Sequence, residues 1–118
     1  MNTELIGDCK LLRIFLGESD RLGHQPLYEA ILQEAKKQNM AGCTVLKGIL
    51  SYGASSRIHS ARLIEISSDL PVVVEIIDFE NKLDPFITIA GELLEKAGCG
   101  GLITVEKADV RWYRSVKK

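Results

Sequence analysis

The chain has 118 residues, of which 46% are hydrophobic, enough for one domain with a core of its own. Its formal net charge is −1, which gives no electrostatic basis for binding nucleic acid or an anionic membrane surface. Three cysteines without CxxC spacing argue against a disulfide framework. No signal-peptide pattern and no bilayer-spanning apolar run are visible, so we expect a single cytoplasmic domain over 1–118 that does not insert into a membrane.

The first half of the chain begins with a short apolar run over 9–17, which predicts a central strand. A polar, turn-rich segment follows. Pro26 then opens a stretch in which apolar residues recur at helical spacing until Gly42, and this predicts a helix over about 26–40.

The stretch after this helix changes halfway from strand-forming residues to a segment that predicts a loop. Residues 43–52 are rich in strand-forming side chains and predict a second strand, in which Gly48 weakens the sheet or marks a bulge. We expect a loop over 53–61, and a short strand or a rigid arm over 62–67.

The second half repeats the alternation of strand and helix. The β-branched run 71–79 predicts a strand, the apolar stripe over 82–97 predicts a helix, and 102–113 predicts a final strand. The order β-α-β-β-α-β predicts an α+β, ferredoxin-like sandwich, with a four-stranded antiparallel sheet and two helices on one face.

The first and third strands sort into two faces, because side chains alternate along a strand. One face is uniformly apolar and should meet the helices. The other face is too apolar to be left exposed to water and too charged to be a core, and this combination is typical of a subunit interface. We therefore expect a homo-oligomer, with Arg13 and Glu75 paired on this face. The face carries Leu11, Arg13, Phe15, Val73, Glu75 and Ile77.

The glycine cluster Gly98-Cys99-Gly100-Gly101 has two interpretations. It is either a nest of backbone N–H groups that binds an anion or a helix C-cap followed by a tight turn, and we favour the cap. The basic end of the chain, which includes Arg114, is either a phosphate clamp or a solvated terminus. We expect the loop after the second strand and the glycine cluster at opposite ends of one sheet, so that they share a pocket only across a subunit boundary.

Metal binding and catalysis have weaker support. The two histidines and three cysteines show no ligand spacing, and we place Cys9 at the sheet end opposite Cys43 and Cys99, so no metal ligand is assigned. Loop serines lie near His59, but an orienting partner is missing, so no catalytic residue is assigned and we expect no enzyme.

Several segments in combination resemble the PII-like family of small bacterial and archaeal proteins, and the resemblance covers about 10–114. The resemblance implies a ferredoxin-like fold assembled as a homotrimer with its sheets facing inward. This agrees with the separate argument from the uncovered face. The segments are Pro26-Leu27-Tyr28-Glu29, Gly42-Cys43-Thr44-Val45, Gly53-Ala54 and 69–78.

In PII signalling proteins, adenine nucleotides bind in clefts between subunits, and a long loop after the second strand engages target proteins. By position, the resemblance implies that Tyr52 and Gly53 are the base of this loop and that 54–67 is the loop itself. It also implies that the glycine turn faces phosphate and that Arg114 contacts it. The implied effector site is Tyr52, Gly53, Ala54, Arg57, His59, Gly98, Gly100, Gly101 and Arg114.

The leading hypothesis is a PII-like signal-transduction protein. It binds a small anionic effector such as ATP, ADP or AMP between subunits and reports it through 53–67 to a target such as a transporter or channel. Two alternatives stay open: a CutA-like trimer that responds to divalent metals, and a small hydrolase that uses His59.

Overall fold

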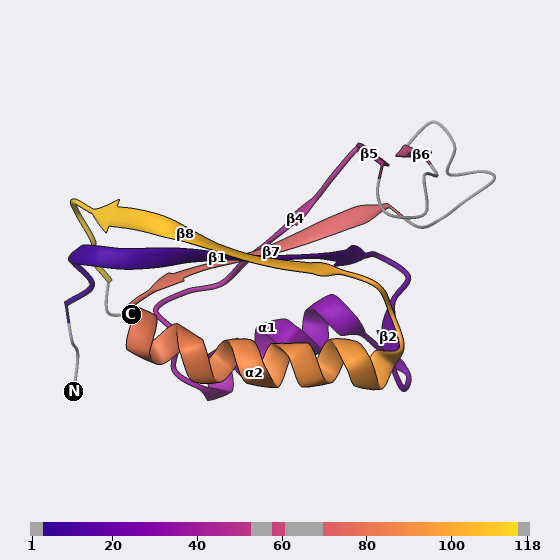
Figure 1. Cartoon of the computed structure of the whole chain (residues 1–118), viewed down its shortest axis with the longest axis horizontal. Coiled ribbons are helices and arrows are strands. Elements are labelled where there is room, and N and C mark those ends of the chain that lie inside the picture. The colour runs from indigo at the N-terminus through magenta and orange to yellow at the C-terminus, as the bar shows by residue number, and fades with distance from the viewer. Residues whose placement is uncertain (1–3, 53–57, 61–69, 116–118) are drawn as a thin grey trace.

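The computed structural model of the chain describes residues 4–52, 58–60 and 70–115. Ten elements follow one another along these residues (Figure 1). In chain order they are β1 (Gly7–Gly17), β2 (Arg21–Leu22), β3 (Gln25–Pro26), α1 (Leu27–Lys37), β4 (Thr44–Lys47), β5 (Leu50–Tyr52), β6 (Ile58–Ser60), β7 (Pro71–Asp78), α2 (Glu80–Ala97) and β8 (Leu102–Val110).

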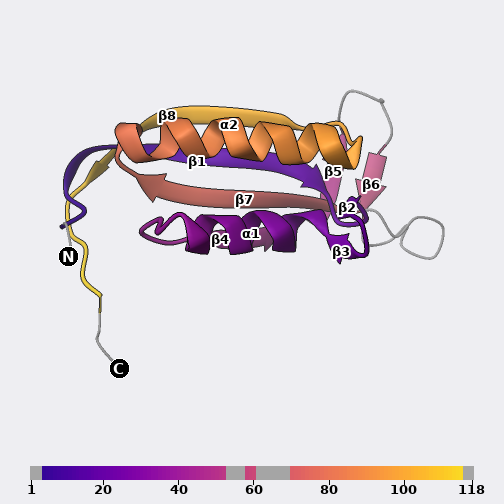
Figure 2. The same cartoon turned by 90° about the horizontal axis from the view of Figure 1, so that it is seen from below.

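The main sheet has the strand order β4-β7-β1-β8, and every neighbouring pair is antiparallel. Both helices lie on the same face of this sheet, with α1 along β4 and β7 and α2 along β1 and β8 (Figures 1 and 2). The predicted α+β, ferredoxin-like architecture is confirmed. Among the described residues, no helix lies over the opposite face of the sheet, which is called the open face below.

The core lies between the sheet and the helices, as the alternation of side chains predicted. Side chains at even positions from 12 to 16 in β1 and from 72 to 76 in β7 are buried against apolar residues of the helices, such as Leu27, Ile31 and Phe86. The two strands contribute Leu12, Ile14, Leu16, Val72, Val74 and Ile76.

The predicted second strand, 43–52, is two strands in two different sheets. β4 ends at Lys47, and β5 pairs with β6 in a separate two-stranded sheet. The main ladder cannot continue past this point on β7, because Pro71 begins that strand and has no N–H to donate. The predicted loop 53–61 therefore contains β6, while 62–67 lies outside the described residues.

The second helix begins two residues earlier than the predicted position 82. Asp78 precedes the N-cap residue Phe79 and accepts its N–H at Oδ1 over 2.8 Å, which fixes the chain just before the first turn. The remaining boundaries of these strands and helices lie within three residues of the predictions, and several coincide with them; Pro26 is the N-cap of α1 and not its first residue.

Candidate functional site

The end of β4 and the start of β8 lie at the same end of the main sheet. Lys47 and Leu16 both pair with Val72, and the neighbouring Phe15 pairs with Leu102. The prediction that the loop base and the glycine cluster lie at opposite ends was therefore wrong. With the order β4-β7-β1-β8, three antiparallel steps separate β4 from β8, so these strands run in opposite directions.

The base of the arm that contains β5 and β6 is Lys47-Gly48, not the predicted Tyr52-Gly53. Gly48 N–H donates to the Pro71 carbonyl oxygen over 2.8 Å. Lys47 Nζ lies 2.8 Å from Glu18 Oε2. Tyr52 lies further out, because it pairs with Ile58 inside the arm.

Part of the implied effector site lies outside the described residues, namely Gly53, Ala54 and Arg57. His59 belongs to β6, where its backbone pairs with that of Ser51. The roles suggested for these residues remain predictions.

The glycine turn closes helix α2. Gly98 has a left-handed backbone with φ 69°, and its N–H donates to the Glu95 carbonyl over 3.0 Å. Cys99 N–H donates to the Leu94 carbonyl over 3.4 Å. Two N–H groups of the proposed nest thus serve as a helix C-cap, which is the interpretation that the sequence favoured.

A carboxylate lies beside this turn. Asp20 Oδ2 accepts the N–H of Gly17 over 2.8 Å. Burial, followed by the negative charge of Asp20, raises the pKa of the Cys99 thiol. The carboxylate therefore places a negative charge beside the turn.

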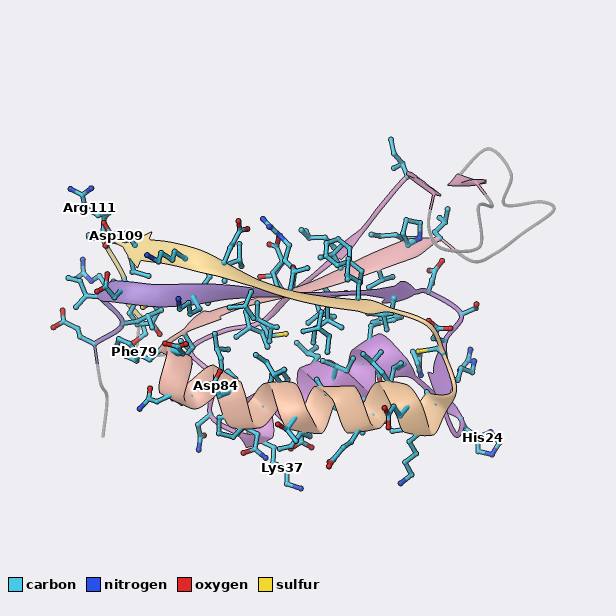
Figure 3. The ribbon with its side chains drawn as sticks, viewed as in Figure 1. His24, Lys37, Phe79, Asp84, Asp109 and Arg111 are labelled. Atoms are coloured by element: carbon cyan, nitrogen blue, oxygen red, sulfur yellow. The ribbon has the colours of Figure 1, made fainter. Side chains whose placement is uncertain are left out.

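Arg114 lies at the other end of the molecule. The chain leaves β8 at Val110, and an exposed ion pair joins Arg111 Nε to Asp109 Oδ2 over 4.0 Å. Figure 3 shows this pair at the end opposite His24, which marks the end of the molecule that holds the glycine turn. Within one protomer, the glycine turn and Arg114 are therefore not brought together.

A cavity that the sequence analysis missed opens on the face without helices, near the C-terminal end of β8. Its volume is about 300 Å³. Strands β1, β4 and β7 supply its floor, and the segment after β8 lies at its side, where Trp112 is 77% exposed. Its lining includes Leu11, Cys43, Thr44, Glu75, Ile77 and Trp112. The aromatic pair 112–113, directly after the last strand, was the available signal.

Glu75, which lines the cavity, also belongs to a charge cluster on the open face. Arg13 Nε donates to Glu75 Oε2 over 2.9 Å, so the predicted pair is confirmed. Arg13 also pairs through Nη1 with Glu106. The hydrogen bond from Arg13 to Glu75 is the largest cause that raises the pKa of the guanidinium. Glu106 was missed because only the first and third strands had been sorted into faces.

The cysteines do not form a metal site with other residues of the described ranges, in which no group of three or more His, Cys, Asp or Glu side chains could hold an ion. The prediction that Cys43 lies at the Cys99 end was wrong. It precedes Thr44, the partner of Glu75, and so lies toward Cys9. Burial raises the pKa of Cys43 to about 11, which keeps this thiol protonated and a poor metal ligand at neutral pH. No helix within the described ranges is long and apolar enough to cross a membrane.

Comparison with solved structures shows the fold. CPII, a nitrogen regulatory PII-like protein from Thiomonas intermedia K12 bound to ADP, AMP and bicarbonate, matches with a TM-score of 0.66 at 16% identity. The match covers 87% of this chain and 88% of CPII. The apo form of CPII matches with a TM-score of 0.60 at 14% identity, over 87% of this chain and 91% of that one. The fold is therefore PII-like.

Comparison of sequences shows the family. A UPF0166 protein of Aquifex aeolicus (strain VF5) is 41% identical over 101 residues, which are 86% of this chain and 91% of the relative. A UPF0166 protein of Methanocaldococcus jannaschii is 29% identical over 90 residues, 76% of this chain and 82% of the relative. The model of the family described as "DUF190: Uncharacterized ACR, COG1993" matches residues 9–110. The chain therefore belongs to the DUF190 (UPF0166) family and has a PII-like fold.

Proposed function

We propose that the chain is a cytoplasmic, PII-like regulatory protein, not an enzyme, and that it binds an adenine nucleotide at the open-face cavity. The observation that carries the proposal is this cavity of about 300 Å³, lined mainly by apolar side chains with a few polar ones. Support comes from CPII, which shares the fold and whose structures hold ADP and AMP.

The lining suits a purine base. Ile77 and Leu11 offer apolar surface, and Trp112 offers an aromatic ring on which a base can stack. Glu75 can accept a hydrogen bond from an exocyclic amine, and Thr44 can donate one. The cations Arg111 and Arg114 follow on the segment beside the cavity, where they would meet the phosphates.

The site would be completed by another copy of the chain. The glycine turn and the base of the arm lie at the end of the protomer away from the cavity, so only a neighbouring subunit can bring them to the same nucleotide. A homotrimer that packs its open faces inward would do this. Signal output would then pass through residues 53–67 of the arm to a target protein such as a transporter or channel.

The test is a titration of the full chain with ATP, ADP and AMP by isothermal calorimetry. Trp112 is the one tryptophan in the sequence, so its fluorescence reports on the cavity without a label. We expect an adenine nucleotide to release or absorb heat and to quench this emission. Trp112→Ala should weaken binding on the order of tenfold, because one base–aromatic stack is lost.

The matched control is Leu32→Ala, which trims another exposed apolar side chain, on α1 and outside this cavity. It should bind as the unmodified chain does. No heat with any of the three nucleotides at millimolar concentration would refute the proposal. Heat without a change in Trp112 emission would place the nucleotide elsewhere.

A further inference from the structure

The open face carries its side chains in rows that cross the sheet from edge to edge. One row is apolar and runs over all four strands: Leu46, Val73, Phe15 and Leu102. The next row is polar: Thr44, Glu75, Arg13 and Thr104. The row on the other side of the polar row consists of the apolar Ile77 and Leu11 and ends with Glu106. The charges are thus bordered by apolar surface on both sides.

The charges in these rows do not balance. One guanidinium, Arg13, pairs with the two carboxylates Glu75 and Glu106, so the cluster carries one excess negative charge. The residue that β4 adds to the polar row is Thr44, which has no charge. Two cations at this edge of the sheet belong elsewhere. Arg111 forms an ion pair with Asp109 beyond the cluster. Lys107 is in register with Lys10 and, one residue after Glu106, lies on the opposite face of the sheet. Within the part of the chain that the structure describes, the bordering strands supply no second cation to the cluster.

The occupant that suits this face is a second copy of the chain. The four strands, about 4.8 Å apart with about 3.3 Å per residue, outline a face on the order of 500 Å² when each has its own length, from the 4 residues of β4 to the 11 of β1. Stable interfaces bury about 800 Å² on each partner. Exposed Leu46, Ile77 and Leu102 lie on it and would be removed from water.

We propose that self-association through the open face takes up protons at the Arg13 cluster, so that the assembly tightens as the pH falls. This rests on the homo-oligomer of the proposed function. When another copy covers the cluster, its excess charge loses water, and related copies bring further excess charges close to it. A proton from solvent that binds a carboxylate oxygen of Glu106 removes the charge. Glu106 is the carboxylate that loses more water on assembly, because its side chain is 58% exposed in the free protomer against 28% for Glu75, and it is not part of the cavity lining.

The test is sedimentation equilibrium of the full chain between about pH 8 and pH 5.5 at constant ionic strength, with Glu106→Gln compared to the unmodified chain. Glutamine keeps the shape and an oxygen that accepts from Arg13, but it has no charge. We expect the dissociation constant of the unmodified chain to fall on the order of tenfold as the pH falls. Glu106→Gln should have a lower dissociation constant than the unmodified chain already at pH 8, and this constant should change by less than about threefold over the same pH range.

The matched control is Glu92→Gln, an exposed residue of α2 on the face of the sheet that carries the helices. It should follow the pH dependence of the unmodified chain. Because His24 and His59 are kept in every variant, their titration cannot account for a difference between the two glutamines. Thermal unfolding of each variant shows whether the fold is intact.

The inference would be overturned by a dissociation constant that is the same at every pH, or by a Glu106→Gln variant that assembles more weakly with its fold intact. Either result would still be consistent with a homo-oligomer. A chain that stays monomeric at every pH would overturn the oligomer as well. Nucleotide titrations of the same samples decide separately whether the cavity binds its ligand.

Discussion

Gly48 donates its backbone N–H to the carbonyl oxygen of Pro71 over 2.8 Å, at the point where β4 ends and β7 begins. The two residues approach so closely that a Cβ on Gly48 would lie 2.7 Å from Pro71 Cγ. A second bond, from Glu18 N–H to the Leu70 carbonyl over 2.7 Å, holds the returning chain. The arm therefore leaves and re-enters the body through a tight, glycine-dependent base.

Gly48→Ala should destabilise the protein by about 1–3 kcal/mol, because the rigid ring of Pro71 must move to admit the methyl group. Urea unfolding followed by circular dichroism measures the change. Gly42→Ala is the control, since a Cβ there meets nothing within 4 Å. Equal stability of the two variants would show that the contact with Pro71 is not tight in solution.

Gly98→Ala should lower the free energy of unfolding by about 1 kcal/mol, because an L residue is strained at φ 69°, where helix α2 ends. Gly100→Ala, for which a Cβ meets nothing within 4 Å and φ is not positive, should be near neutral. Thermal unfolding distinguishes them. If Gly100→Ala were the more damaging variant, the turn would have a role other than capping.

Asp78→Ala should destabilise the protein by about 1–3 kcal/mol for each backbone donor left without a partner. The carboxylate is 2% exposed and accepts from Ala41 N–H over 2.9 Å and from Phe79 N–H over 2.8 Å, and so ties the α1–β4 connection to the start of α2. The control Asp84→Ala changes an exposed carboxylate on α2. A chemical-unfolding midpoint that moves no more for Asp78→Ala than for this control would contradict the prediction.

Cys43 should react slowly with iodoacetamide at pH 8. Its pKa of about 11 leaves about a hundredfold less thiolate than an ordinary thiol of pKa 9.0. Peptide mapping by mass spectrometry gives the rate, which should rise with pH until about pH 11. A rate that levels off near pH 9 would contradict this.

The same thiol links stability to pH. Burial raises the folded-state pKa of Cys43 above the ordinary 9.0. The contribution of the protonated thiol to the stability of the fold is therefore complete below pH 9 and is lost as the pH rises toward 11. Cys43→Ser should therefore show a smaller loss of stability between pH 9 and pH 11 than the unmodified chain, measured by urea unfolding at each pH.

The main features of the fold follow from local patterns. Alternation in 9–17 and 71–79 identified two strands and their buried faces, and Gly98 identified the end of α2, because these depend on side-chain periodicity and on backbone preference. The division of 43–52 into β4 and β5 was not predicted. It depends on Pro71, far along the chain, which deprives the ladder of a donor.

The candidate site was less predictable than the fold. Sequence alone determined the α+β class, the PII-like resemblance and the pair between Arg13 and Glu75, since neighbouring strands in this order place them side by side. Only the tertiary structure decided that Glu106 joins the pair, that the glycine turn and the arm base share one end, and that Trp112 borders a cavity at the other. The physical reason is that each of these depends on strand direction and register between segments distant in sequence, which no local pattern of residues encodes.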